Sequence, residues 1–267
     1  MKKRYVVAGI MLLAAVLLVM PMQAKAEMYV EAYLGGVFGS SGTNDISGTA
    51  TRGGAFGAWD FTPSGAIDPA FQGGLKVGTW FVKEGVLGYN YPDWMKYLGF
   101  YLDFSYHRLD YRRQTGTWAN VGALPFNDNF FSEGYAATLA FMFAARYGFL
   151  PDSEVPFGRL QPYLAVGPAI LFSGQRPSFY QVSPAAAWAL KGPSQSSTDI
   201  CLAVEAGIRY MALKNVSVEV SYKFRYANPT YNYSGLGDNN APPFIYSFSY
   251  SPNYYLHSVQ VGAAYHF

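Results

Sequence analysis

The chain has 267 residues, of which 51% are hydrophobic and 18% aromatic, but only 13% are charged. An ordinary soluble domain has about 25% charged residues, so this composition argues against a soluble enzyme and, equally, against disorder. The single cysteine, Cys201, excludes an intrachain disulfide framework and multi-cysteine metal sites, and three histidines leave little metal chemistry. We therefore expect a folded chain with no metal and no cofactor.

Residues 1–26 are organised like a secretory signal peptide. Basic residues at positions 2–4 precede an apolar run over 5–20, and a small-x-small pattern ends at Ala26. A retained membrane helix is the alternative, because the apolar run approaches the roughly 20 residues that span a bilayer. We favour cleavage after Ala26, which leaves 27–267 as one exported domain.

Cleavage would also change the charge of the protein. It removes four of the 19 basic residues and none of the 17 acidic ones, so the net charge falls from +2 to −2. The basic character belongs to the uncleaved chain, and we expect no nucleic-acid partner.

The rest of the chain shows the period of β-strands. From 216 to 226, valine, tyrosine and phenylalanine alternate with serine, glutamate, lysine and arginine, which predicts a strand with one apolar face. In chain order, alternation of this kind predicts strands at 28–39, 71–81, 97–108, 133–147, 159–172, 198–211, 216–226 and 256–267. These lengths exceed the roughly 5–6 residues of soluble strands and suit a tilted membrane crossing, which needs about 9–11.

No stretch after the signal peptide has the roughly 18 consecutive apolar residues of a membrane helix. Strands survive in hydrocarbon only if the sheet closes and every backbone group is paired. We therefore predict an all-β fold, a closed antiparallel transmembrane β-barrel of eight strands with both termini on the periplasmic side. Long connections, such as 35–74 and 228–252, are interpreted as solvated outer loops. Weak alternation over 244–250 leaves ten strands as the alternative, and we favour an extension of the last hairpin above the membrane.

The two faces of the predicted strands differ in character. The outward face is apolar, whereas the inward face carries nine charged residues: Glu31, Lys76, Asp103, Arg146, Glu205, Arg209, Glu219, Lys223 and Arg225. The lumen of an eight-stranded barrel is only wide enough to be filled by side chains, so we expect these residues to pair as a structural plug. A gated ion path is the alternative. Pro162 and Pro168 each remove a backbone donor and predict a local distortion of their strand.

The end of the chain carries a resemblance to a known family. Val259, Val261, Ala263 and Tyr265 alternate before a terminal Phe267, and the segments 161–167 and 205–210 have matching strand motifs. This pattern resembles the OmpA-type superfamily of eight-stranded outer-membrane barrels, the small porin-like proteins of Gram-negative envelopes. The resemblance implies an outer-membrane location and recognition of the C-terminal signature by the barrel assembly machinery. The chain stops at its last strand, so the peptidoglycan-binding domain of OmpA is not expected.

Some small barrels of this class modify lipid A, so catalytic residues need consideration. Asp103, Ser105 and His107 share one strand face, but Asp103 and His107 are about 13 Å apart along it and cannot hydrogen-bond directly. We therefore expect a protein without catalytic residues.

A binding role is easier to argue from the sequence. Arg108, Arg112 and Arg113 lie at the outer end of a predicted strand, where lipopolysaccharide phosphates would lie, and arginine binds phosphate in a bidentate manner. Ordinary solvated loop charge is the alternative. Taken together, we expect a monomer in contact with outer-membrane lipids, with a structural or surface-interaction role exerted through four long extracellular loops. A narrow channel for small solutes and a lipid A-modifying enzyme are the alternative functions.

Overall fold

The computed structural model describes residues 27–267 except 43–45, 53–54, 83–90, 121–125, 183–186 and 238–243. The expected signal peptide therefore lies outside the described residues. Eight long strands form the wall: β1 (Glu27–Gly42), β4 (Ala70–Trp80), β5 (Leu98–Arg108), β7 (Phe126–Arg146), β8 (Leu160–Val182), β10 (Gln195–Leu213), β11 (Val216–Ala227) and β14 (Asn253–His266). Each of them overlaps one of the eight segments in which alternation predicted a strand, and the predicted bounds that fall outside a strand do so by one residue.

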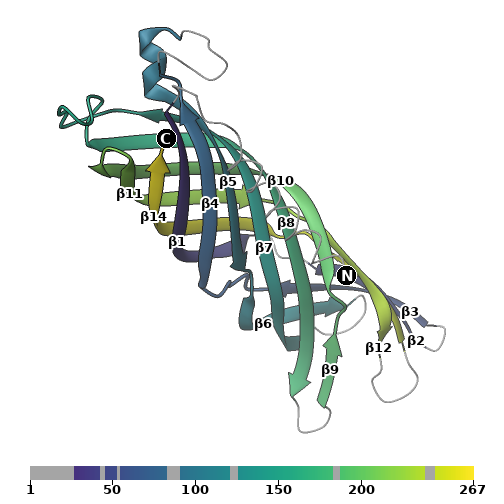
Figure 1. Ribbon diagram of the computed structural model, residues 1–267. Coiled ribbons are helices and arrows are strands. Elements are labelled where there is room, and N and C mark those ends of the chain that lie inside the picture. Colours follow the sequence, from purple (N-terminus) through teal and green to yellow (C-terminus); the bar gives the residue numbers. More distant parts are fainter. Residues whose placement is uncertain are drawn as a thin grey trace, which may run out of the picture.

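The eight strands close into a barrel. Each pairs antiparallel with its neighbours in the order β1-β4-β5-β7-β8-β10-β11-β14. The first and last strands then pair from Tyr29 with His266 to Gly42 with Asn253, which removes the free edges of the wall (Figure 1). The predicted eight-stranded transmembrane barrel is confirmed, and closure satisfies the backbone groups that hydrocarbon would leave unpaired.

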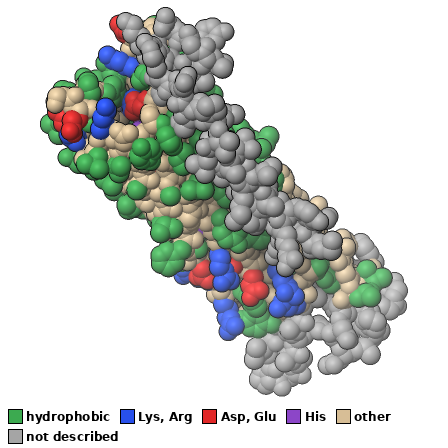
Figure 2. Space-filling model, viewed as in Figure 1, with side chains coloured by type: hydrophobic (Ala, Val, Ile, Leu, Met, Phe, Trp, Pro, Cys, Tyr) green, Lys and Arg blue, Asp and Glu red, His purple; other side chains and the backbone are tan. Residues whose placement is uncertain are grey.

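Side chains alternate between lumen and outer surface along each strand, as the pleat of a β-strand requires. Exposed large apolar residues cover the wall, among them Leu34, Leu75, Phe143, Leu164, Val166, Ile200, Leu202, Ile208, Val220 and Val261. Figure 2 shows this surface as a hydrophobic band between two zones in which charged side chains gather. An apolar belt between two polar rims is the surface of a membrane-spanning barrel.

Six further strands lie beyond the outer end of the barrel: β2 (Ile46–Arg52), β3 (Ala55–Pro63), β6 (Tyr111–Asn120), β9 (Ala187–Lys191), β12 (Tyr231–Gly237) and β13 (Phe244–Tyr250). They pair in the order β12-β13-β2-β3-β6-β7, while β9 pairs with β8. The interpretation of the long connections as solvated loops is therefore wrong. The expectation that 244–250 extends the last hairpin is confirmed, because β13 pairs with β12 and β2. We call these six strands, with the outer ends of β7 and β8, the outer extension (Figure 1).

The outer extension is ordered because it has an apolar interior of its own. The buried side chains at this end of the molecule, which we call the aromatic cap, are Ile46, Trp59, Phe61, Tyr111, Phe130, Phe179, Tyr231, Tyr233, Tyr246, Phe248, Tyr250 and, on β14, Tyr254. The ring centroids of Phe61 and Phe130 both lie 5.3 Å from that of Phe179, at distances typical of favourable aromatic pairs. Burial raises the pKa of Tyr111 to about 12, so its hydroxyl stays protonated. The aromatic cap lies over the outer mouth of the lumen.

At the opposite end of the barrel, the connection between β7 and β8 is bonded to the short turn between β10 and β11. Arg159 forms ion pairs with Asp152 and Glu154, and its Nη1 donates to the carbonyl oxygen of Met211 at 3.1 Å, so it joins two neighbouring turns. The backbone N–H of Val155 and the Arg159 guanidinium lower the pKa of Asp152. A short 3₁₀ helix spans Asp93–Tyr97. Within the described ranges, no helix has the length and hydrophobicity that a membrane crossing requires.

The two prolines of β8 affect one side of the strand only. Towards β10 the register is continuous through Pro162 and Pro168. Towards β7 the described pairs pass from Ala140 directly to Phe143, so the ladder is interrupted opposite Pro168 without a change of register. This is the effect expected of a residue that lacks a backbone donor.

Candidate functional site

The centre of the lumen holds ion pairs arranged around Lys76 on β4. Its Nζ atom lies 2.6 Å from Oε1 of Glu205, 2.6 Å from Oε1 of Glu219 and 3.0 Å from Oε1 of Glu31. These four side chains are 2% exposed or less. Three carboxylates from three strands share one ammonium group, and this pairing offsets the cost of burying each charge.

Arg209 and Tyr163 complete the coordination of the same carboxylates. Arg209 Nη2 lies 2.9 Å from Oε2 of Glu31 and 2.8 Å from Oε2 of Glu219. The Tyr163 hydroxyl lies 2.5 Å from Oε1 of both Glu205 and Glu219. The carboxylates are therefore held by the Tyr163 hydroxyl of β8 and the Arg209 guanidinium of β10 as well as by Lys76. The cluster connects opposite walls of the barrel.

A second ammonium group continues the network towards the outer end. Lys223 forms an ion pair with Asp103, and its Nζ lies 3.0 Å from Oε2 of Glu205. Tyr33 donates its hydroxyl proton to Oδ1 of Asp103 at 2.6 Å. Because Glu205 is shared by Lys76 and Lys223, the two parts form one connected cluster.

Arg225 lies in a neutral polar layer beyond this cluster. Its Nη2 donates to Oε1 of Gln72 at 2.7 Å and to Oγ of Ser258 at 3.3 Å, and its Nη1 donates to Thr138 at 3.1 Å and Ser105 at 3.2 Å. In the described part of the chain Arg225 has no carboxylate within ion-pair distance. Amide and hydroxyl groups from four strands thus hold a buried guanidinium.

The periplasmic end of the lumen is closed around Arg146. Its two terminal nitrogens lie 2.7 and 2.5 Å from the two carboxylate oxygens of Glu27, and Nη1 lies 3.0 Å from Oε1 of Gln161. The guanidinium carbon is 4.1 Å from the ring centroid of Trp80 and 4.2 Å from that of Phe157, distances at which cation–π attraction operates. A bidentate ion pair and two aromatic rings therefore fill this end.

The structure places all nine charged residues of the predicted interior in the lumen, each buried. It adds Glu27, which the sequence analysis missed although it shares the parity of Glu31. With Glu27 the lumen holds five acidic and five basic side chains: Glu27, Glu31, Asp103, Glu205 and Glu219, and Lys76, Arg146, Arg209, Lys223 and Arg225. Among the described residues, the charges of the lumen therefore balance.

The three residues considered for catalysis do not meet in the structure. Asp103 is bound by Lys223 and Tyr33, and Ser105 accepts from Arg225. His107 is buried, and its Nδ1 lies 2.7 Å from the backbone oxygen of Arg108. Among the described residues, no group of three metal-ligating side chains is placed to hold a metal ion.

The three candidate lipid-binding arginines lie on the outer surface above the apolar belt. A β-bulge between Tyr111 and Gln114 sets both Arg112 and Arg113 opposite one residue of β7, and both side chains are exposed. Arg108 pairs with Asp110 at 2.8 Å and Arg112 with Asp68 at 3.3 Å, whereas Arg113 lies over the ring of Tyr180 at 5.2 Å. The bulge therefore turns two successive arginines to the same surface.

The C-terminal signature lies on the lipid-facing side of the wall. Val259, Val261, Tyr265 and Phe267 are exposed large apolar residues, Ala263 shares their face, and β14 pairs with both β1 and β11. The terminal aromatic rings of Tyr265 and Phe267 lie 5.0 Å apart. The signature is therefore a row of side chains on the strand that closes the barrel.

A closed eight-stranded wall with an apolar outer belt and a filled polar lumen defines an integral β-barrel membrane protein. A family profile described as "Outer membrane protein beta-barrel domain" matches residues 11–267. The chain belongs to this family, which confirms the predicted resemblance and places the protein in the outer membrane.

The solved structures that match the chain are distant in sequence. Neisserial surface protein A (NspA) is 13% identical with a TM-score of 0.40, over 90% of this chain and 97% of that chain. OprG from Pseudomonas aeruginosa is 14% identical with a TM-score of 0.41, over 91% and 96%. The outer membrane protease OmpT from Escherichia coli is 12% identical with a TM-score of 0.31, over 92% and 98%. No curated protein matches the chain significantly.

Proposed function

We propose that this protein is a sealed, monomeric outer-membrane barrel that presents its outer extension to partners outside the cell. The observation that carries the proposal is the filled lumen, from the Arg146 closure through the Lys76 cluster and the Arg225 layer to the aromatic cap. Side chains of opposite walls are bonded to one another at each of these levels. A lumen filled in this way serves as a rigid core for what the barrel displays.

The outer extension supports a surface role. Flexible loops pay an ordering cost when they bind, whereas paired strands over a packed aromatic interior present a preorganised surface. At one hairpin of this surface, Leu236 and Ile245 lie opposite one another, and both are exposed apolar side chains. The extension therefore offers both shape and apolar contact area.

Conductance separates this proposal from a solute channel. We expect the mature protein, reconstituted in planar bilayers, to add no single-channel steps above the baseline, because side chains of opposite walls are bonded across the lumen at the ion-pair clusters. A porin in the same bilayers is the positive control. Reproducible steps would favour the channel. The enzymatic alternative predicts a mass change of lipid A upon expression, and we expect none.

We further propose that Arg108, Arg112 and Arg113 contact lipopolysaccharide phosphates. Exposed ion pairs such as Arg108–Asp110 contribute only about 0–1 kcal/mol, so a phosphate can displace the carboxylate. In the described part of the chain Arg113 has no carboxylate partner. Arginine forms bidentate bonds with phosphate, and two of the three arginines share the surface that the bulge creates.

Glutamine substitution of the three arginines tests this contact. We expect the triple variant to copurify with about tenfold less lipopolysaccharide, since about 1.4 kcal/mol of lost phosphate binding corresponds to that factor. Arg176→Gln, which removes another exposed arginine of the outer surface, is the matched control. Equal lipopolysaccharide in the triple variant, the control and the wild type would reject the contact.

We propose the usual maturation route for such a chain. The signal peptide is cleaved after Ala26, which leaves Glu27 as the first residue of β1, and the barrel assembly machinery reads the signature that ends at Phe267.

A further inference from the structure

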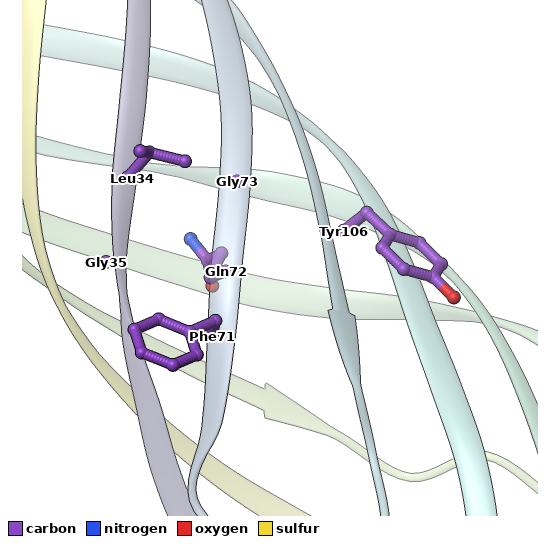
Figure 3. A pocket seen from close by; sticks show the side chains of 6 residues that line it. All are labelled: Leu34, Gly35, Phe71, Gln72, Gly73 and Tyr106. Atoms are coloured by element: carbon purple, nitrogen blue, oxygen red, sulfur yellow. The ribbon is translucent and has the colours of Figure 1, made fainter.

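The lipid-facing wall has a hollow at the outer end of β1, β4 and β5. It is a groove of about 550 Å³ lined by Leu34, Gly35, Phe71, Gln72, Gly73 and Tyr106 (Figure 3). Figure 3 shows the side chains of Leu34 and Phe71 over the seam between β1 and β4, with Tyr106 on the neighbouring strand. The volume is within the roughly 300–1,000 Å³ of ordinary ligand sites.

Glycine on the outward face creates this hollow. Gly73 pairs with Leu34, and a Cβ atom added at Gly73 would meet only Leu34 Cδ2, at 3.5 Å. The side chains around it are unusually exposed: Phe71 is 93% exposed, Leu34 74% and Tyr106 51%. Such apolar exposure is typical of a surface that faces hydrocarbon, so the lining of the groove suits a lipid acyl chain.

Arg108 lies just beyond the outer end of the groove. Arg108 follows Tyr106 by two residues on the same face of β5, a distance of about 7 Å along the strand. In the register of β4 and β5, Gly73 pairs with Tyr106 and Gln72 with His107, so Phe71 and Arg108 are at the next level. One lipid molecule can therefore place its phosphate at Arg108 and an acyl chain in the groove.

We propose that the groove holds one acyl chain of a lipid A molecule whose phosphate contacts Arg108. The proposal rests on the lipopolysaccharide contact argued above and adds a defined apolar subsite to it. The Arg108 guanidinium favours an outer-leaflet lipid that carries phosphate at its headgroup. The space above Gly73 holds the acyl chain in one place, whereas a chain elsewhere would move freely along the wall.

Gly73→Leu fills the groove without disturbing the wall, because the space above Gly73 is open. Ala206→Leu is the matched control, since it adds a similar side chain at an exposed position of β10, on the other side of the barrel. Purified full-length mature proteins in micelles are titrated with hexa-acylated lipid A, and phosphatidylglycerol is the competitor. Heat modifiability on gels verifies that every variant is folded.

We expect Gly73→Leu to bind lipid A about tenfold more weakly, because some ten van der Waals contacts are lost, and Ala206→Leu to bind like the wild type. Equal binding of lipid A by Gly73→Leu and Ala206→Leu overturns the proposal that the groove holds an acyl chain, even if the triple arginine variant binds weakly. If the arginine variant binds normally, the phosphate contact fails and the lipid A assignment fails with it. Phosphatidylglycerol that competes as well as lipid A would also overturn the assignment.

Discussion

Lys76→Met is expected to destabilise the barrel by about 3–5 kcal/mol, the usual cost of removing one partner from a buried ion-pair cluster. Lys76 Nζ lies within 3.0 Å of three carboxylates, and methionine keeps the shape of the side chain but not its charge. Without Lys76, those carboxylates converge in the lumen with only Arg209 and Lys223 to compensate them. Urea unfolding in lipid vesicles, followed by tryptophan fluorescence, measures the change.

Two further variants make this prediction sharp. Lys214→Met removes an exposed lysine from a periplasmic turn and should change the free energy of unfolding by less than about 0.5 kcal/mol. Glu205→Gln in the Lys76→Met background removes one of the excess negative charges that the loss of Lys76 leaves in the lumen, so the double variant should lose less stability than the sum of the single changes. Equal stability of Lys76→Met and Lys214→Met would show that the cluster is not needed for folding.

The barrel could be predicted from the sequence because a membrane imposes a simple rule on strands. Lipid on one side and a polar lumen on the other require alternation, and one register error would place Lys76 or Glu205 in hydrocarbon. The same rule identified the inward residues one by one. The pattern over 27–31 would also have identified Glu27, had the alternation been continued to the first residue after the expected cleavage site.

The contacts within the lumen could not be predicted in this way. Alternation tells whether each side chain points into the lumen or towards lipid. Which residues of two strands lie at the same level along the barrel depends on the register between those strands. Only the register brings Lys76 to Glu205, 129 residues away, and to Tyr163. It also leaves Arg225 among amides and hydroxyls, although it was expected to pair with an acid.

Apart from 244–250, the strands of the outer extension were missed for a different physical reason. Glycine, serine and asparagine in the long connections are typical of solvated loops, and strands outside the membrane have no lipid to enforce a continuous apolar face. Their order comes from aromatic residues spaced widely in the sequence, such as Phe61, Phe130 and Phe179. The bulge that turns Arg112 and Arg113 outward is likewise a property of the β6–β7 pairing.

Cys201 is expected to be at least about 1,000-fold less reactive in the folded protein than when exposed. It is free, faces the lumen and is 4% exposed, between the ion-pair cluster and the aromatic cap. A membrane-impermeant charged maleimide can reach it only if the lumen opens, and an opening free energy of about 4 kcal/mol corresponds to that factor. Ser234→Cys in a Cys201→Ser background supplies an exposed thiol on the outer extension as the control.

The rate of maleimide addition to Cys201, followed by mass spectrometry of the folded protein in vesicles, is the most direct test of a sealed lumen. A thiol that stays unmodified while the Ser234→Cys control reacts within minutes, and that reacts fully after unfolding in urea, is the predicted result. Addition to folded Cys201 at a rate close to that of the control would mean that the outer end of the lumen is open, and would contradict the account.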